Sequence, residues 1–314
     1  MTGAPTRALP RTVVGVDIGG TKTCAAVIDD TGVVLARSES GTPGPDGRKA
    51  LLHNVVERIN EVIRVTGAEP LAVGVGAAGV IDSRAGVVVS STDVLKGWAG
   101  TPVAAELRRA TGLPTTVDND VHAHALGEVW RGAAKGVDQV LYVAVGTGVG
   151  ASWVHRGWVR HGARNAAGHL GHVPAPDASG LPCVCGGEGH LEAIAAGPAI
   201  CRAVTRRTGA PFARLQDVVR RALDGPGPAR DELLRGAQAL GSVVGGAVNL
   251  LDPDMVVIGG GVVGAGDIWW RPMIDALRRE LLPATRDVAV VPSSLGADAA
   301  LVGAARLAWR SLDG

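Results

Sequence analysis

A glycine-rich turn near the start of the chain carries residues that suit phosphate binding. Asp17 precedes it, and the turn itself consists of Gly19, Gly20, Thr21 and Lys22. Two adjacent glycines let backbone N–H groups face a phosphate, while Thr21 adds a hydroxyl and Lys22 a positive charge. Asp17 can hold Mg²⁺ through water, because hard cations on phosphates prefer oxygen ligands. An ordinary tight turn explains the same letters, so this turn alone does not settle the interpretation.

A second turn of the same type favours the phosphate interpretation. Gly146, Thr147 and Gly148 follow an apolar strand, as the first turn does, and two such turns can grip a polyphosphate. A third glycine element follows another predicted strand and is predicted to open a helix near a nucleoside. It consists of Gly259, Gly260 and Gly261.

Asn119 and Asp120 stand where a predicted strand meets a predicted helix at 121–130. Capping the helix is a frequent role for both residue types. The alternative is that one carboxylate accepts a proton from an attacking hydroxyl. A helix N-terminus keeps such a carboxylate ionised and therefore a weak base. A weak base suffices for phosphoryl transfer, which depends mainly on positioning and charge stabilisation.

A cluster of two imidazoles and two thiols predicts a zinc site. Its members are His172, Cys183, Cys185 and His190. Four such ligands suit tetrahedral Zn²⁺ and leave no open position for a reacting water, so the predicted role is structural. The one-residue spacing of the cysteines is not the commonest zinc spacing. Reduced surface cysteines in a glycine-rich loop are the alternative.

The elements that must position these residues occur in two similar series. Strands at 12–18, 24–28 and 33–37 form a predicted antiparallel meander, and a helix at 48–66 and further strands at 71–75 and 114–117 follow. The pattern restarts at 139–145 and continues with strands at 151–155, 158–160, 255–258 and 288–291. The other predicted helices span 103–111, 191–208, 230–251 and 297–312. The repetition predicts a two-domain α/β architecture with a cleft between the halves.

The predicted first lobe covers 1–120, with the last helix (about 297–314) packing back on it, and the second covers 121–314 with its zinc loop at 172–190. A length of 314 residues suits two domains. The net charge of +1 argues against a nucleic acid or an anionic membrane as the partner. No signal peptide or membrane-spanning stretch is evident, and the four cysteines do not resemble a disulfide framework. A cytoplasmic location is therefore predicted.

With these motifs in this order, the sequence resembles the ROK group of repressors, open reading frames and sugar kinases. The resemblance covers nearly the whole chain and implies the actin/hexokinase-like (ribonuclease H-like) fold. It makes Asp120 the catalytic base, Asn119 a sugar ligand and Gly79 the point where backbone meets the sugar. Glu192 matches a sugar-binding glutamate. His172 matches a residue that binds zinc through one ring nitrogen and a sugar hydroxyl through the other.

Three positions depart from the family pattern. His190 replaces a cysteine of the zinc loop, and imidazole can serve as the ligand instead. Asp93 stands where many relatives carry asparagine. His169 replaces the glutamate of the family's glucokinases; neutral imidazole accepts one hydrogen bond where glutamate accepts from two adjacent hydroxyls. This change suits a sugar with an acetamido group at C2 and resembles some bacterial N-acetylmannosamine kinases. The preferred acceptor is therefore N-acetylmannosamine, with glucose as the alternative.

The resemblance implies ATP as the phosphoryl donor with Mg²⁺, transfer to the 6-hydroxyl of a hexose, and a homodimer or homotetramer. A sugar-responsive transcriptional repressor is the main competing class. Such relatives carry a helix-turn-helix before the kinase-like body, and only eleven residues precede Thr12 here. A sugar-binding protein without catalysis would not need Asp17, Asp120 and both glycine turns.

Overall fold

The computed structural model describes residues 11–92 and 94–313. These residues divide into two compact units: those up to 131 together with 297–313 form one, and 132–296 form the other. No helix among the described residues combines the length and the apolar composition that crossing a membrane requires.

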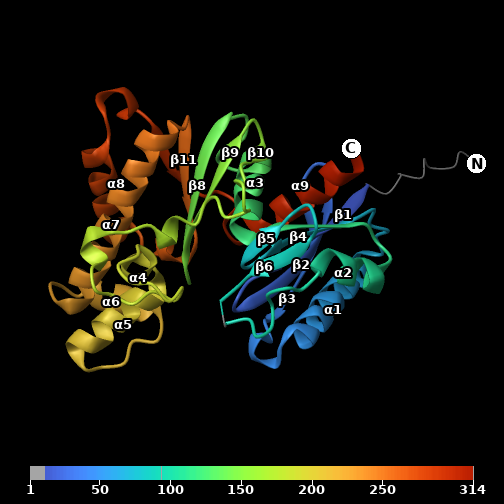
Figure 1. Ribbon diagram of the computed structural model, residues 1–314, viewed down its shortest axis with the longest axis horizontal. Helices are drawn as coiled ribbons and strands as arrows, with labels where there is room; N and C mark the ends of the chain where they lie inside the picture. The colour runs from blue at the N-terminus through green and yellow to red at the C-terminus, as the bar shows by residue number, and fades with distance from the viewer. Residues whose placement is uncertain (1–10, 93, 314) are drawn as a thin grey trace, which may run out of the picture. The chain divides into compact units, whose positions relative to one another are not determined.

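The first unit is built on a five-stranded mixed sheet with the order β3-β2-β1-β4-β7 (Figure 1). Its strands are β1 (Thr12–Ile18), β2 (Lys22–Asp29), β3 (Val34–Gly41), β4 (Val73–Ala77) and β7 (Thr115–Asn119). The first three form the predicted antiparallel meander, and β4 and β7 add parallel to β1. A small hairpin, β5 (Val80–Asp82) and β6 (Val87–Ser90), was not expected from the sequence.

Helices cover both faces of this sheet. They are α1 (Arg48–Thr66), α2 (Val103–Thr111), α3 (Asp120–Arg131) and α9 (Ala299–Asp313). Alternate residues of β1 face opposite sides, as strand geometry requires: Val14 and Val16 join the core with α1 and α2, and Val13 joins the core with α9. Glycine at Gly15 and Gly74 lets α9 lie directly on the sheet, because a Cβ there would overlap carbonyl oxygens of α9.

Helix α3 belongs to the first unit, so the division falls after Arg131 rather than at the predicted residue 120. The reason is close packing of α3 against α9: a Cβ on Gly127 would overlap the carbonyl of Ala299, and one on Gly303 that of Ala123. The strand-to-helix junction at 119–120 therefore lies inside a unit, not between two units.

The second unit repeats the strand arrangement of the first. Its sheet has the order β10-β9-β8-β11-β12, again with an antiparallel meander followed by two parallel strands. The strands are β8 (Gln139–Val145), β9 (Val149–His155), β10 (Trp158–Val159), β11 (Met255–Gly259) and β12 (Ala289–Pro292). The internal duplication predicted from the order of elements is present.

The helices of the second unit differ more from the sequence-based expectation. They are α4 (Glu192–Ala195), α5 (Gly197–Thr208), α6 (Leu215–Leu223), α7 (Pro228–Leu251) and α8 (Asp267–Glu280). The single helix predicted for 191–208 is two helices, because the chain is extended at Ala196 and Pro198 starts α5. Helices α6 and α8 were not predicted, and the glycines at 259–261 lead into a 3₁₀ turn, Gly261–Ala265, instead of directly into a helix.

Candidate active site

The first glycine turn connects β1 to β2 and is fixed by backbone and threonine contacts. The N–H of Gly19 donates to the carbonyl of Lys22 (3.0 Å), and the N–H of Thr42 donates to the carbonyl of Thr21 (2.9 Å). The Thr42 hydroxyl donates to the carbonyl of Gly19 at 2.8 Å. The end of β3 therefore holds the turn, while Thr21 and Lys22 remain exposed.

Lys22 is held by an acidic partner that the sequence did not single out. Its Nζ donates to Glu39 at 2.5 Å, and Arg37 donates to the other oxygen of Glu39 at 2.5 Å. Hydrogen bonds from Lys22, Cys24 and Arg37 lower the pKa of Glu39 to about 2. The ammonium group of Lys22 therefore forms an ion pair with a carboxylate on β3.

Asp17 and Asp120, predicted separately, act on each other electrostatically. The pKa of Asp17 is raised to about 7, first by burial and then by the charge of Asp120, while the charge of Arg37 partly opposes the rise. A buried carboxylate whose ionisation is disfavoured by a neighbouring carboxylate is a suitable oxygen ligand for a divalent cation, which would offset that penalty. The residues present therefore fit Mg²⁺.

At the Asn119–Asp120 junction, the helix cap is Asn119 rather than Asp120. Strand β7 ends at Asn119 and α3 starts at Asp120, with no loop between them. The Asn119 side-chain oxygen accepts from the N–H groups of Val121 (2.9 Å) and His122 (3.2 Å), so Asn119 is the cap. Asp120 Oδ1 accepts from Val121 N and Asn119 Nδ2, both at 2.9 Å. Among the described residues, Asp120 Oδ2 has no hydrogen-bond partner.

Gly79 is joined to this junction through its backbone. Asn119 Nδ2 also donates to the carbonyl of Gly79 at 2.9 Å. The φ of Gly79 is +112°, and a Cβ there would lie 2.5 Å from the carbonyl oxygen of Ser90, so only glycine fits. The first unit thus brings together Asp17, Gly79, Asn119 and Asp120. Asp93 lies outside the described residues.

In the second unit, the Glu192 side chain is hydrogen-bonded to the backbone at the end of the second glycine turn. The turn joins β8 to β9, and its Gly146 N–H donates to the carbonyl of Gly148 (2.9 Å). Glu192 Oε2 accepts from the N–H of Val149 at 2.7 Å. A Cβ on Gly148 would lie 2.6 Å from the same oxygen. The predicted phosphate turn and the predicted sugar ligand are therefore in direct contact.

A cavity of about 270 Å³ lies beside this turn and includes part of the third glycine element. Gly260 has a φ of +92°, and a Cβ there would overlap the backbone of Val145, which lets the two turns approach. The lining consists of Gly146, Thr147, Gly197, Pro198, Cys201, Ala213, Leu215, Gln216, Gly261 and Val262.

The sequence interpretation missed most of that lining. The missed residues come from the first half of α5, from Ala213 and the start of α6, and, in the case of Val262, from the 3₁₀ turn after Gly260. Proline in the first helical turn is a recognised start signal, so Gly197-Pro198 could have revealed the beginning of α5. For Ala213, Leu215 and Gln216 no local motif exists. Gly148 and Gly259 are not part of the lining; Gly259 packs against the Tyr142 hydroxyl.

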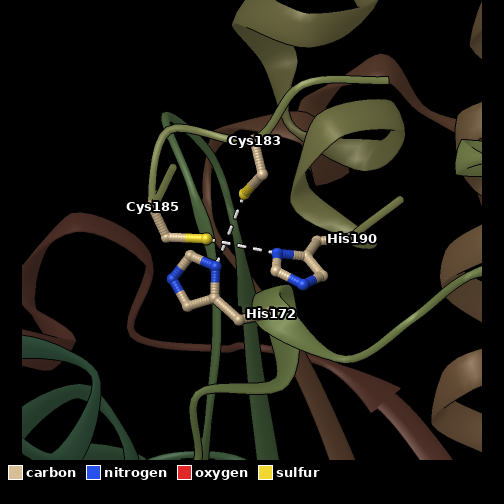
Figure 2. Close-up of side chains that lie close together, drawn as sticks. All are labelled: His172, Cys183, Cys185 and His190. Carbon is tan, nitrogen blue, oxygen red and sulfur yellow. Dashed lines mark hydrogen bonds between the residues drawn. The ribbon is translucent and has the colours of Figure 1, made fainter. Parts of the chain in front are cut away.

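The four predicted zinc ligands lie together in the second unit (Figure 2). Their ligating atoms are all within 4.8 Å of one another. Cys183 Sγ is 3.5 Å from His172 Nδ1, and Cys185 Sγ is 3.2 Å from His190 Nδ1. Burial raises the pKa of the Cys183 thiol, so a cation is needed to hold it as thiolate. Two sulfurs and two imidazole nitrogens at this separation fit tetrahedral Zn²⁺.

His169 lies beside this cluster. Its ring is stacked on that of His172, with centroids 6.1 Å apart and planes at 25°. His169 Nδ1 is 3.1 Å from the carbonyl oxygen of Ala166. A carbonyl only accepts, so Nδ1 carries the proton, and Nε2 is the acceptor of the neutral ring. In Figure 2 the second ring nitrogen of His172 points away from the two sulfurs.

Comparison with known proteins places this geometry in a family. The model of the ROK family matches residues 13–311. A glucokinase of Halalkalibacterium halodurans is 32% identical, with 93% of this chain and 93% of that protein covered. An N-acetylmannosamine kinase of Citrobacter koseri is 33% identical, with 94% and 98% covered.

A solved structure agrees with the sequence match. The ROK family glucokinase of Streptomyces griseus, crystallised with glucose and AMPPNP, superposes with a TM-score of 0.84 at 30% identity. The alignment covers 95% of this chain and 99% of that one. The predicted actin/hexokinase-like fold is thereby confirmed, and the chain belongs to the ROK family.

Proposed function

We propose that this protein is an ATP-dependent sugar kinase that phosphorylates the 6-hydroxyl of a hexose. The observation that carries the proposal is the Asn119–Asp120 junction. It holds one oxygen of Asp120 in hydrogen bonds and leaves the other without a partner among the described residues. That arrangement suits a carboxylate that accepts a proton while its orientation stays fixed.

Asp120 acts as the base in this proposal. Its Oδ2 takes the proton of the sugar 6-hydroxyl as the hydroxyl oxygen attacks the γ-phosphorus of ATP. The bond between the γ-phosphorus and the oxygen that bridges to the β-phosphate breaks, and ADP leaves. Asn119 binds a sugar hydroxyl beside it, and the backbone at Gly79 contacts the ring. Mg²⁺, with Asp17 in its surroundings, would neutralise phosphate charge.

The cavity of the second unit supports a nucleotide as the phosphoryl donor. The Thr147 hydroxyl and the backbone N–H of Gly261 can face phosphate oxygens at one end. The walls contributed by Pro198, Ala213 and Leu215 are apolar and suit the faces of a purine. The Streptomyces griseus relative was crystallised with an ATP analogue.

The acceptor we favour is N-acetylmannosamine, and His169 carries this choice. Its Nδ1 is used by the carbonyl of Ala166, so the neutral ring presents a single acceptor at Nε2. A pair of adjacent free hydroxyls needs two acceptors, whereas a sugar with an acetamido group at C2 presents one hydroxyl fewer. His172 and Glu192 would contribute further sugar contacts.

Glucose is the second candidate. A relative that is 32% identical is named glucokinase, and the Streptomyces griseus glucokinase was solved with glucose. The relative named N-acetylmannosamine kinase is 33% identical, so overall identity does not discriminate between the two sugars.

A coupled assay of ADP release over a panel of hexoses and N-acetylhexosamines tests the proposal. We expect turnover with N-acetylmannosamine and a loss of at least about 100-fold in kcat for Asp120→Asn, because general-base contributions reach that size. Sugar binding, measured by calorimetry, should persist in this variant. Asp30→Asn, in the exposed turn after β2, is the matched control and should keep full activity.

Two outcomes would contradict the assignment. Substantial turnover by Asp120→Asn would remove Asp120 from the role of base. Sugar binding without ADP release by the wild type would instead favour a sugar-responsive regulator or a non-catalytic sugar-binding protein.

A further inference from the structure

We infer that Asp118 and His122 form a buried pair that positions the proposed sugar ligand Asn119 and the proposed base Asp120. Neither residue touches substrate in the proposed function, on which this inference rests. Both act through the backbone at the strand-to-helix junction, and they are positioning residues.

The pair is defined by burial and by two short contacts to one oxygen. Asp118 is 2% exposed and His122 is 3% exposed. His122 Nδ1 is 2.9 Å from Asp118 Oδ1. The backbone N–H of Asn119 donates to the same Oδ1 at 2.7 Å. Oδ1 is already the acceptor for the Asn119 N–H, and with Nδ1 of His122 as the donor the same oxygen accepts both hydrogen bonds.

These contacts close a ring across the junction. Asp118 is the residue of strand β7 just before Asn119, and His122 is in the first turn of α3. The side chain of His122 reaches back to Asp118, while the side chain of Asn119 reaches forward to the N–H groups of Val121 and His122. The strand end and the helix start are thus tied in both directions.

The ring matters because β7 passes into α3 without a connecting loop. Any change in the direction of the Asn119 backbone moves the Asn119 side chain, which in turn donates to Asp120 Oδ1 at 2.9 Å. Losing the His122 donor leaves a buried carboxylate with one hydrogen bond fewer, and such a group relaxes towards other donors or water. The orientation of Asp120 would then change.

A purely structural role for His122 makes a different prediction. A core histidine stabilises the fold, and its loss lowers stability without acting selectively on the chemical step. A positioning role predicts a loss of turnover in the folded protein, because misplacing a reacting group by about 1 Å can cost about 100-fold.

Three variants separate the two roles. His122→Leu removes the donor but keeps a buried side chain, and His122→Asn keeps an N–H donor near the position of Nδ1. Leu126→Ala, at a fully buried position in the same helix, is the control for lost stability. Each is assayed for kcat, for KM of sugar and ATP, and for thermal stability.

We expect His122→Leu to lower kcat/KM for the sugar about 100-fold, with KM for ATP unchanged. His122→Asn should recover at least about tenfold of that loss. Leu126→Ala should melt at a lower temperature but retain the kcat of the wild type at temperatures where it is folded. Full turnover by His122→Leu, or equal loss in all three variants, would overturn the inference.

A measurement without substrate keeps the inference separate from the proposed function. Hydrogen exchange at the Asn119 amide should be slow in the wild type and in His122→Asn, and faster in His122→Leu. Unchanged protection in His122→Leu would contradict the positioning role even if the protein phosphorylates no sugar. Absence of any kinase activity in the wild type, with the exchange pattern as expected, would refute only the proposed function.

Discussion

At the scale of single residues, the chemistry of the first unit depends on carboxylates that act on one another. Asp17 lies near the end of β1, just before the first glycine turn, and Asp120 is the first residue of α3. The charge of Asp120 nevertheless contributes to the high pKa of Asp17. The sequence predicted both residues but not their interaction, because the register between β1, β4 and β7 that brings them together is non-local. The Lys22–Glu39 pair was missed for the same reason.

The pKa of Asp17, raised to about 7 by burial, predicts a pH-dependent stability. Between pH about 4 and about 7 the native state retains a proton that the unfolded chain releases, so native stability falls as the pH rises through this window. Asp17→Asn should therefore be more stable than the wild type at pH 8, on the order of 2–4 kcal/mol, and equal to it near pH 4.

Urea unfolding at both pH values measures this difference. A chelator must be present, since a divalent cation would hold the carboxylate ionised. The exposed Asp30→Asn variant should show no such change between the two pH values. If the free energy of unfolding of Asp17→Asn differs from that of the wild type by the same amount at pH 4 and pH 8, the predicted titration of Asp17 is wrong.

His169 determines the choice of acceptor in our proposal. His169→Glu replaces one acceptor with two carboxylate oxygens, so the ratio of glucose to N-acetylmannosamine turnover should rise by about tenfold or more. The ratio of the two kcat/KM values is the measurement. Arg164→Glu, on the same loop but in an exposed position, controls for the added negative charge. An unchanged ratio in His169→Glu would remove this residue from the specificity argument.

At the scale of elements, local pattern predicted most strands and helices but not those that depend on tertiary packing. Strand β1 and helices α1 and α2 start and end where the sequence placed them. Helix α8 was missed because Pro272 stands inside it and argues against a helix. It forms because Trp269, Met273 and Leu277, spaced by four residues, pack into the core of the second unit.

The zinc loop shows the opposite case, since its ligand types predicted a cluster in a segment with little regular structure. Cys183→Ser should lower bound zinc from about one per chain to nearly none, and the loop at 172–190 should become sensitive to proteases. Elemental analysis and limited proteolysis measure these effects. Cys24→Ser, in β2, should leave the zinc content unchanged. Wild-type protein purified without bound zinc would contradict the assignment.

Close helix packing in the first unit gives a second prediction at this scale. In Gly303→Ala the new Cβ would overlap the carbonyl of Ala123, so the free energy of unfolding should fall by about 1–3 kcal/mol or more. The same substitution at Gly246, exposed in α7 with no atom within 4 Å, should instead stabilise by about 1 kcal/mol. Denaturant unfolding of both variants tests the difference. Equal effects would show that α3 and α9 can separate without cost.

At the scale of the whole molecule, the sequence predicted a duplicated α/β chain, and the two sheets share one strand order and one pattern of parallel and antiparallel pairs. The predicted division was less accurate, because the helix at 120–131 starts at the proposed base Asp120 and carries the packing glycine Gly127 further along. Only the contacts of Gly127 and Gly303 show to which unit that helix belongs.

The return of α9 to the first unit also bears on how the chain is made. During synthesis residues 12–131 leave the ribosome first, but the helix that covers one face of their sheet is made only after the whole second unit. Until then Val13, Ala26 and Ile28 lack the apolar partners Leu301 and Ala305 that bury them in the finished protein. The second unit, whose residues are contiguous, can complete its core first. The half that is synthesised first is therefore the half that matures last, and during that interval its uncovered sheet face is a natural target for a chaperone.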